Sequence, residues 1–214
     1  MVLSADDDTP AAPSDTYFEP QRMRSRKALR CARCRYSLGV CMCDEVVALP
    51  TRTRVLVVAH YIELHKTTNT SRLAALALSN ASVRGRGHPE ERTAPPVPDG
   101  KRLVLYPGVG ARELTASDAA DDLILVVPDG TWTQAGRVAR RDPAAVGAEQ
   151  VRLPGTHASR YTLRRGAREG GVCTLEALAL ALGILEGARV EAHLLAVFDE
   201  FQRRALARRD GLDP

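Results

Sequence analysis

Short valine-rich runs alternate with helix-like segments from residue 54 onward, and this alternation constrains the fold more than any other feature of the sequence. The apolar runs occupy residues 54–60, 101–106, 122–127 and 150–153. Apolar residues with helical spacing occupy residues 70–78, 132–141, 174–185 and 190–209. Because such apolar runs are typical of buried parallel strands, the sequence predicts an α/β fold with a mainly parallel sheet flanked by helices.

The sequence divides into three segments in this interpretation. Residues 1–21 are acidic and lack a periodic apolar pattern, so we expect a disordered tail. Residues 22–48 are basic and contain four cysteines, and we expect a small zinc-binding module there. Residues 49–210 form the α/β domain, in which residues 84–101 are expected to be a loop because they are rich in glycine and proline.

The composition excludes several classes of protein. With 44% hydrophobic residues the chain can bury a core, which excludes global disorder. No apolar run approaches the roughly 20 residues of a membrane-spanning helix, and the acidic N-terminus lacks the basic flank and apolar core of a signal peptide. We therefore expect a cytoplasmic protein without a membrane partner, whose five cysteines are not paired in disulfides.

The charge is unevenly distributed along the chain. Of the 26 acidic and 30 basic residues, five acidic residues and no basic residue lie within residues 1–20, so the remainder carries a net charge of +9. All but three of the basic residues are arginines, whose guanidinium groups bind phosphate and stack on bases. This favours a nucleic acid partner, although a GC-rich coding sequence also yields arginine in place of lysine.

Four cysteines lie close together, as Cys31-Ala-Arg-Cys34 and Cys41-Met-Cys43. Four thiolates suit the tetrahedral coordination of zinc, and the two-residue gap of the first pair is usual in zinc knuckles. The pattern predicts a structural zinc site, with metal-free or redox-active thiols as the alternative. The neighbouring Arg33 and Arg35 are candidates for binding RNA phosphates, with a solvated basic surface as the alternative.

In a parallel α/β sheet the ligand site lies beyond the carboxyl ends of the strands. Here those ends are followed by residues 60–61, 106–108 and 128–130. In the last of these, Asp129 is a candidate hydrogen-bond acceptor or base, and the lone tryptophan, Trp132, either stacks on a flat ligand or packs in the core. The alternative is that Asp129 or Thr131 only caps the helix that follows.

Two further polar segments precede predicted helices, whose N-termini favour anions. They are residues 60–70 and residues 156–176. Ordinary surface loops have the same composition, and Glu176 fits a capping box at the start of its helix. No segment has the glycine pattern of a dinucleotide site or a P-loop.

Together these motifs resemble the DTW-domain proteins, a family named for Asp-x-Thr-Trp, which is Asp129-Gly130-Thr131-Trp132 here. The resemblance covers roughly residues 31–186, with the motifs in the same order. The other motifs are the four-cysteine cluster, His60-x-x-Glu63 with Asn69-Thr70-x-Arg72-Leu73, Ser159-Arg160-Tyr161-x-Leu163-Arg164, and Gly171-x-Cys173-Thr174-x-Glu176.

The resemblance implies a tRNA-uridine aminocarboxypropyltransferase whose fold is similar to the SPOUT methyltransferases, including a knot near the C-terminus. Such enzymes transfer the 3-amino-3-carboxypropyl group of S-adenosylmethionine to N3 of a uridine in tRNA and release methylthioadenosine. The candidate catalytic residues are then Asp129, Thr131 and Trp132. The expected S-adenosylmethionine pocket comprises Tyr106, Pro107, Gly108, Pro128, Asp129, Gly130, Leu163, Gly171, Val172, Cys173 and Thr174. The expected contacts with tRNA are Arg33, Arg35, His60, Lys66, Asn69, Arg72, Arg160, Arg164 and Arg165.

Several alternatives stay open under this interpretation. Asp129 is either the general base for N3 or the partner of the donor's amino group. The chain is also compatible with an RNA methyltransferase on the same scaffold, or with a non-catalytic zinc-knuckle protein that binds RNA. The by-product formed from S-adenosylmethionine distinguishes these three functions. We expect a monomer, although SPOUT-like proteins often dimerise.

Overall fold

The computed structural model describes residues 29–88, 96–97, 99–163 and 171–211. The predicted acidic tail at residues 1–21, the start of the predicted zinc module at residues 22–28, and Arg164 and Arg165 lie outside the described residues. No helix in the described part of the chain is both long enough and apolar enough to cross a membrane.

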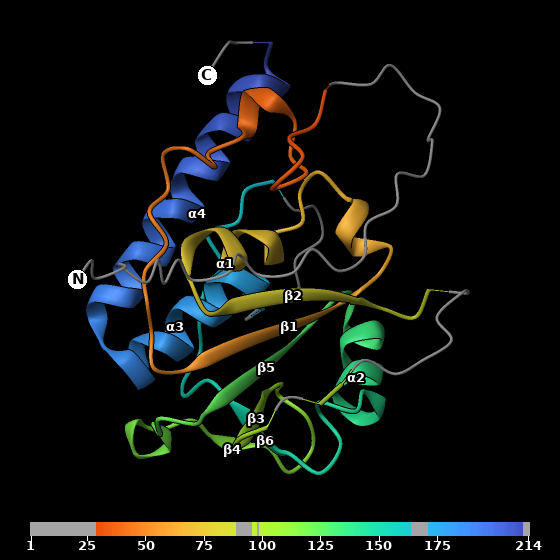
Figure 1. The fold of residues 1–214 in the computed structure, drawn as a ribbon, viewed down its shortest axis with the longest axis vertical. Coiled ribbons are helices and arrows are strands. Elements are labelled where there is room, and N and C mark those ends of the chain that lie inside the picture. The colour runs from red at the N-terminus through yellow and green to blue at the C-terminus, as the bar shows by residue number, and fades with distance from the viewer. Residues whose placement is uncertain (1–28, 89–95, 98, 164–170, 212–214) are drawn as a thin grey trace, which may run out of the picture.

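A six-stranded sheet forms the centre of the protein (Figure 1). Its strands are β1 (Arg54–His60), β2 (Ala81–Arg86), β3 (Arg102–Leu105), β4 (Arg112–Glu113), β5 (Ile124–Asp129) and β6 (Glu149–Arg152). They lie in the order β2-β1-β5-β3-β6-β4, and every pairing between them is parallel. The predicted α/β class with a parallel sheet is therefore confirmed, whereas the knot stays a prediction.

Helices cover both faces of this sheet (Figure 1). They are α1 (Ser71–Ala77), α2 (Trp132–Arg141), α3 (Thr174–Glu186) and α4 (Ala188–Arg209), with the short 3-10 helices η1 (Leu38–Val40), η2 (Glu63–His65) and η3 (Ala116–Asp118). Because side chains alternate along a strand, Val55 and Val57 of β1 join the core cluster that includes α1, α3 and α4. Leu56 and Val58 point to the opposite face, where α2 packs.

The cysteine-containing segment packs into the larger of these cores. Cys34, Tyr36 and Met42 are buried in the same cluster as Phe198 and Phe201 of α4. The rings of Tyr36 and Phe201 lie 4.8 Å apart between centroids. The boundary that we place at residue 48 stays a prediction, but the described part of the segment shares its buried face with the α/β domain.

Two strands were not predicted, and one is longer than expected. β2 includes residues 84–86, which the sequence suggested were part of a loop; this prediction is wrong. β2 is an edge strand paired on one side with β1, and its polar residues and Gly85 conceal it. The two-residue strand β4 was also missed.

β5 continues through Pro128 to Asp129 instead of stopping at Val127. Proline has no backbone N–H to donate, and is therefore unusual in a strand that has a neighbour on each side. Pairing of β5 with β3 ends at Val126, whereas pairing with β1 continues as far as Asp129. The proline therefore lies where one of the two neighbouring ladders has already ended.

Asp142, at the C-terminal end of α2, anchors edge strand β2. It is buried, it is ion-paired with Arg84 and Arg86 of β2, and it accepts a hydrogen bond from the backbone N–H of Ala144 at 2.9 Å. The two guanidinium groups are only partly exposed. The carboxylate thus compensates charge that water reaches poorly.

We expect Asp142→Ala to lower the free energy of unfolding by about 2–3 kcal/mol, since it leaves two partly buried cations without this carboxylate. Urea denaturation monitored by circular dichroism measures the change. Asp121→Ala serves as the control, because Asp121 is exposed and makes one long contact of 4.0 Å with Arg52. Equal stability of the two variants would contradict this role of Asp142.

Candidate functional site

A cavity of about 410 Å³ opens at the carboxyl edge of the sheet. This volume is within the range of roughly 300–1,000 Å³ usual for small-molecule sites. It is lined by the segments that follow β1, β3, β5 and β6 and by the N-terminus of α3. Parallel pairing explains the convergence, because it places the carboxyl ends of all these strands at one edge.

Most of the residues predicted for the donor pocket and for catalysis line this cavity. They are Tyr106, Pro107, Pro128, Asp129, Gly130, Thr131, Trp132, Gly171, Val172, Cys173 and Thr174. Two predicted residues do not line it. Gly108 lies next to Gln150, and a Cβ added there would come within 2.3 Å of the Gln150 Oε1 atom. Leu163 packs against the large core.

Asp129 is a buried acidic residue on the wall of the cavity, and only 8% of its surface is exposed. Asn69 donates from Nδ2 to Asp129 Oδ2 at 2.8 Å, and the Thr174 hydroxyl donates to Asp129 Oδ1. These donors come from the loop before α1 and from the first residue of α3. Two neutral groups from distant parts of the chain therefore fix the orientation of the carboxylate.

The turn between Asp129 and α2 requires glycine. Gly130 has φ of +150°, and a Cβ there would meet the Gln134 side chain at 2.9 Å. Thr131 is the N-cap of α2, where its hydroxyl accepts from the Gln134 N–H at 3.3 Å and its own N–H donates to Gln134 Oε1 at 2.8 Å. The capping alternative is thus confirmed for Thr131, whose backbone and side chain still border the cavity.

Trp132 is not a core residue. It is 42% exposed, lines the cavity, and lies 6.3 Å from the Tyr106 ring between centroids. The two aromatic rings provide an open apolar wall on which a flat group can pack. Of the two possibilities left open by the sequence, packing in the core is therefore wrong, and stacking on a ligand stays a prediction.

The loop between β1 and α1 forms another wall. Lys66 and Asn69 line the cavity, as does Glu63, whose carboxylate accepts from Lys66 Nζ at 2.7 Å. The Tyr161 hydroxyl donates to the Thr68 carbonyl oxygen at 2.5 Å and so ties this loop to the segment after β6. Asn69, predicted to contact RNA, is instead buried against Asp129.

Glu176 organises the segment before α3. Its carboxylate accepts from the Ser159 hydroxyl, from the Arg160 N–H and from the Cys173 N–H, each at 2.7 Å. The capping box suggested by the sequence is present, with Cys173 as the N-cap. Burial raises the pKa of the Cys173 thiol to about 12, so it is a protonated structural group at neutral pH.

The remaining predicted RNA contacts that the structure describes lie outside the cavity. Arg33 and Arg160 are exposed and ion-paired, with Asp44 and Asp199 respectively. Arg35 adopts a left-handed backbone conformation with φ of +62° in the turn after Cys34. His60 lies at the end of β1, with its ring 5.1 Å from that of Tyr61.

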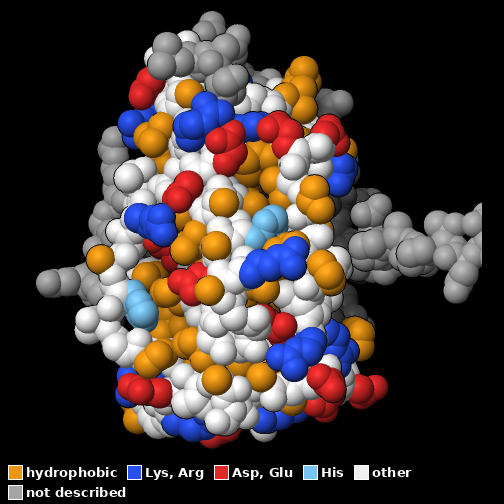
Figure 2. All heavy atoms as spheres, turned by 90° about the vertical axis from the view of Figure 1, so that its left-hand side faces the viewer, with side chains coloured by type: hydrophobic (Ala, Val, Ile, Leu, Met, Phe, Trp, Pro, Cys, Tyr) orange, Lys and Arg blue, Asp and Glu red, His pale blue; other side chains and the backbone are white. Residues whose placement is uncertain are grey.

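Arg72 is placed differently from its prediction. It is buried, with a guanidinium carbon 4.2 Å from the centroid of the Tyr36 ring. A side chain in that position supports the loop beneath it and does not present its charge to an RNA backbone. Figure 2 shows the face that lies on the left-hand side of Figure 1. On this face the described basic and acidic side chains are interspersed, and they form no single basic patch.

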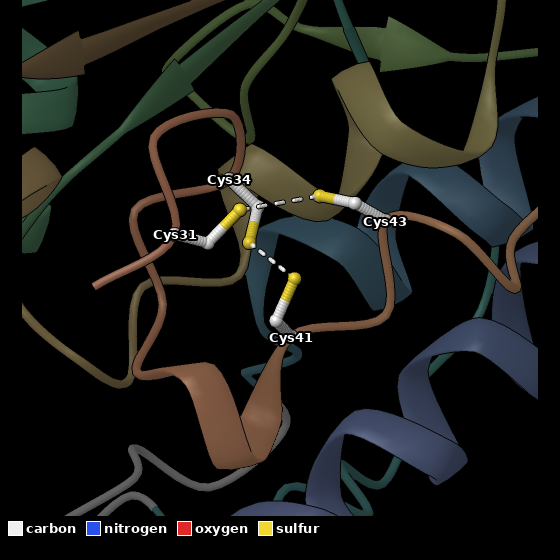
Figure 3. A group of neighbouring side chains, drawn as sticks. All are labelled: Cys31, Cys34, Cys41 and Cys43. Carbon is white, nitrogen blue, oxygen red and sulfur yellow. Dashed lines mark hydrogen bonds between the residues drawn. The ribbon is translucent and has the colours of Figure 1, made fainter. Parts of the chain in front are cut away.

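The four clustered cysteines have the geometry of a metal site. Their thiols point toward one another (Figure 3), and the four sulfur atoms lie within 4.8 Å of each other. The Sγ–Sγ distances are 3.8 Å for Cys31 and Cys43 and 3.7 Å for Cys34 and Cys41. A zinc ion about 2.3 Å from each of four tetrahedrally arranged sulfurs would separate the sulfurs by about 3.8 Å, so the residues fit zinc.

The thiols of this cluster differ in acidity. Burial raises the pKa of Cys31, but hydrogen bonds from the backbone of Cys34 and from the Cys41 thiol outweigh burial and bring it down to about 7. Burial raises the pKa of Cys34 to about 11. Binding of zinc at neutral pH therefore releases protons from the more buried thiols.

Some cavity residues were not predicted. They are Glu63, Thr68, Thr70, Leu105, Val127, Ala135, Arg152, Leu153, Gly155, Thr156, His157, Tyr161 and Ala177. The segment after β6 had a usable signal, because Pro154-Gly155 follows a predicted strand and the carboxyl-end rule applies to it as well. Tyr161 is held at the cavity by its hydrogen bond to Thr68, which lies 93 positions away in the sequence. No local sequence pattern reveals such a contact.

Comparison with known proteins agrees with these motifs. A model of the DTW domain matches residues 28–206. The protein named tRNA-uridine aminocarboxypropyltransferase 2 in Macaca fascicularis is 30% identical over 198 residues, which cover 87% of this chain and 65% of that protein. The protein of the same name in Drosophila melanogaster is 28% identical over 167 residues, which cover 73% of this chain and 66% of that protein.

The chain thus spans just under two thirds of the length of these curated relatives. Among solved structures, the SAM-dependent rRNA:acp-transferase Tsr3 from Vulcanisaeta distributa matches 75% of this chain and 80% of its own. The TM-score is 0.49 and the sequence identity is 18%.

We expect the purified protein to contain one zinc ion per chain, measured by inductively coupled plasma mass spectrometry. Cys41→Ser should lower this content and the melting temperature, because one thiolate ligand is removed. Cys173→Ser is the matched control, since Cys173 lies outside the cluster and serine is also a good N-cap. Full zinc content in Cys41→Ser, or its loss in Cys173→Ser, would contradict the assignment.

Proposed function

The chain belongs to the DTW domain family, and from that premise we propose that it transfers the 3-amino-3-carboxypropyl group of S-adenosylmethionine to N3 of a uridine in tRNA. Methylthioadenosine is the by-product. The names of the curated relatives support this proposal. The single observation that carries it is the buried Asp129 carboxylate of the DTW motif, held in the cavity by Asn69 and Thr174.

The reaction makes a limited demand on the protein. A bond forms between N3 and the γ-carbon of the aminocarboxypropyl group, the bond from that carbon to sulfur breaks, and sulfur leaves as a neutral thioether. S-adenosylmethionine supplies the activated sulfonium. The protein must hold the γ-carbon, and not the methyl group, in line with N3, and must accept the N3 proton.

The residues of the cavity fit such a donor. The apolar wall of Tyr106 and Trp132 suits a flat base. The N-terminus of the 13-residue helix α3 faces the cavity through Thr174 and favours a carboxylate. Asp129 offers a fixed negative charge to an amino group or to the proton of N3. The amino group and the carboxylate of the donor thus each have a counterpart of suitable chemistry.

The position of Asp129 is consistent with either of its two roles. Its two oxygens each accept one hydrogen bond from a neutral donor, which leaves lone pairs free for a further contact. As a general base it would take the proton of N3 directly. As an anchor it would hold the donor's ammonium group and so aim the γ-carbon.

Contacts with tRNA are proposed for the basic residues around the cavity. Lys66 lines the cavity itself, and Arg160 belongs to the segment that Glu176 fixes beside it. Arg33, Arg35 and His60 are further candidates, and Arg164 and Arg165 are candidates outside the described residues. We also propose a cytoplasmic monomer, which light scattering coupled to gel filtration tests.

Incubation of bulk tRNA with S-adenosylmethionine and the full chain tests the proposed function. Mass spectrometry should detect methylthioadenosine and an aminocarboxypropyl uridine in digested tRNA. S-adenosylhomocysteine would instead show an RNA methyltransferase. Binding of tRNA without consumption of S-adenosylmethionine would show a non-catalytic RNA-binding protein.

We expect Asp129→Asn to lower the turnover rate by about 10²–10⁴-fold, the range for loss of a general base. If Asp129 is the base, calorimetry should show unchanged binding of S-adenosylmethionine. If Asp129 anchors the amino group, binding should weaken together with turnover. Asp121→Asn, a change at an exposed carboxylate, is the control. Normal turnover by Asp129→Asn would exclude both roles.

A further inference from the structure

A buried arginine, Arg72, packs against Tyr36 of the cysteine segment and has no acidic partner among the described residues. Arg72 is only 8% exposed, and its Nη2 atom donates to the Lys66 carbonyl oxygen at 2.7 Å. Its Nε and Nη1 atoms are buried and have no hydrogen-bond partner among the described residues. Within that part of the chain no carboxylate forms an ion pair with it either. Such a cation is costly unless negative charge lies near it.

Tyr36 connects this arginine to the cysteine segment. It lies two residues after Cys34, it is 1% exposed, and its ring packs under the Arg72 guanidinium at 4.2 Å. Its hydroxyl donates to the backbone carbonyl oxygen of Asn69. Tyr36 and Arg72 together therefore hold the two ends of the segment from Lys66 to Asn69.

The missing negative charge is available from the cysteines. Burial is the largest influence on the Arg72 guanidinium and lowers its pKa, whereas Tyr36 and the Cys34 thiol act in the opposite direction. A zinc ion bound by four thiolates would carry a net charge of about −2. The geometric link is Tyr36, whose ring packs against the Arg72 guanidinium and whose backbone carbonyl oxygen accepts from the Cys31 N–H at 2.8 Å.

The segment that Tyr36 and Arg72 hold also positions Asp129. Asn69 donates from its amide to Asp129 Oδ2 at 2.8 Å. The Ser71 hydroxyl donates to Asn69 Oδ1 at 2.6 Å, which fixes the orientation of that amide. A shift of the Asn69 backbone therefore moves the donor that orients the carboxylate.

We propose that Tyr36 and Arg72 are positioning residues that couple the four-cysteine zinc site to Asp129. The catalytic meaning of this coupling rests on the proposed function, whereas the coupling itself is a property of the folded chain. The cysteine segment then supports the position of Asp129 through Tyr36 and Asn69. A separate RNA-binding knuckle would leave the cavity unchanged when zinc is lost.

Hydrogen exchange measured by mass spectrometry on the full chain, with zinc bound and after chelation, separates these two cases. We expect exchange in residues 66–72 to rise about tenfold after chelation, as for loss of roughly one hydrogen bond in that segment. Exchange in α2 should stay unchanged. A rise confined to residues 31–43 would overturn the proposal.

Tyr36→Phe keeps the ring and removes only the hydroxyl, so it tests the coupling even where chelation unfolds the chain. We expect full zinc content and about fivefold to tenfold faster exchange in residues 66–72. Tyr61→Phe is the matched control, because Tyr61 directly follows β1 and its ring contacts with His60 and His88 are retained. Identical exchange in the two variants would overturn the proposal.

Arg72→Met tests the link to the metal. Transfer of zinc to a coloured chelator should be about tenfold faster or more than in the unmodified protein, the scale usual for groups that support metal ligands. Arg72→Lys retains the charge and should restore part of the difference. Equal rates for all three proteins would overturn this role of Arg72.

These measurements are independent of the transfer assay. If the chain transfers no aminocarboxypropyl group but the exchange and zinc-release results hold, the proposed function fails and the coupling stands. If transfer occurs, Tyr36→Phe should lower kcat; KM for S-adenosylmethionine should stay unchanged if Asp129 is the base and should rise if Asp129 anchors the donor. Transfer with an unchanged kcat in Tyr36→Phe would overturn the coupling alone.

Discussion

Parallel pairing of β5 between β1 and β3 is the constraint on which the site depends. Because all pairings in this sheet run in the same direction, the segments that leave the carboxyl ends of four strands meet at one edge. Asp129 is the last residue of the central strand and still pairs with Ala59 of β1. The ladder with β1 therefore positions its backbone, and its side chain lines the cavity.

Local sequence signals predicted the elements whose first and last residues are marked in the sequence itself. β1 and α2 were predicted with the bounds they have, because β1 is a continuous apolar run and α2 begins at a capping box and ends before Asp142-Pro143. β2 was missed because an edge strand needs no apolar run; it depends on β1 and on the ion pairs of Arg84 and Arg86 with Asp142.

The composition of the site was predictable, whereas its contacts were not. The carboxyl-end rule and the DTW resemblance together identified about half of the residues that line the cavity. The hydrogen bond from Asn69 to Asp129 joins residues 60 positions apart, and that from Thr174 joins residues 45 positions apart. For Arg72 the sequence predicted the wrong role. An arginine in a polar segment indicated a contact with RNA, whereas its burial against Tyr36 indicates a supporting role.

The neutral character of the groups around Asp129 has an electrostatic consequence. An amide and a hydroxyl orient the carboxylate and leave its negative charge uncancelled. An arginine or lysine in the same places would neutralise that charge. Lys66, the basic side chain of the adjacent wall, is paired with Glu63. The proposed donor carries positive charge on its sulfonium and on its amino group. In a partly closed cavity, where water screens charge less than in bulk solvent, an uncancelled carboxylate attracts such a cation and favours one orientation of it.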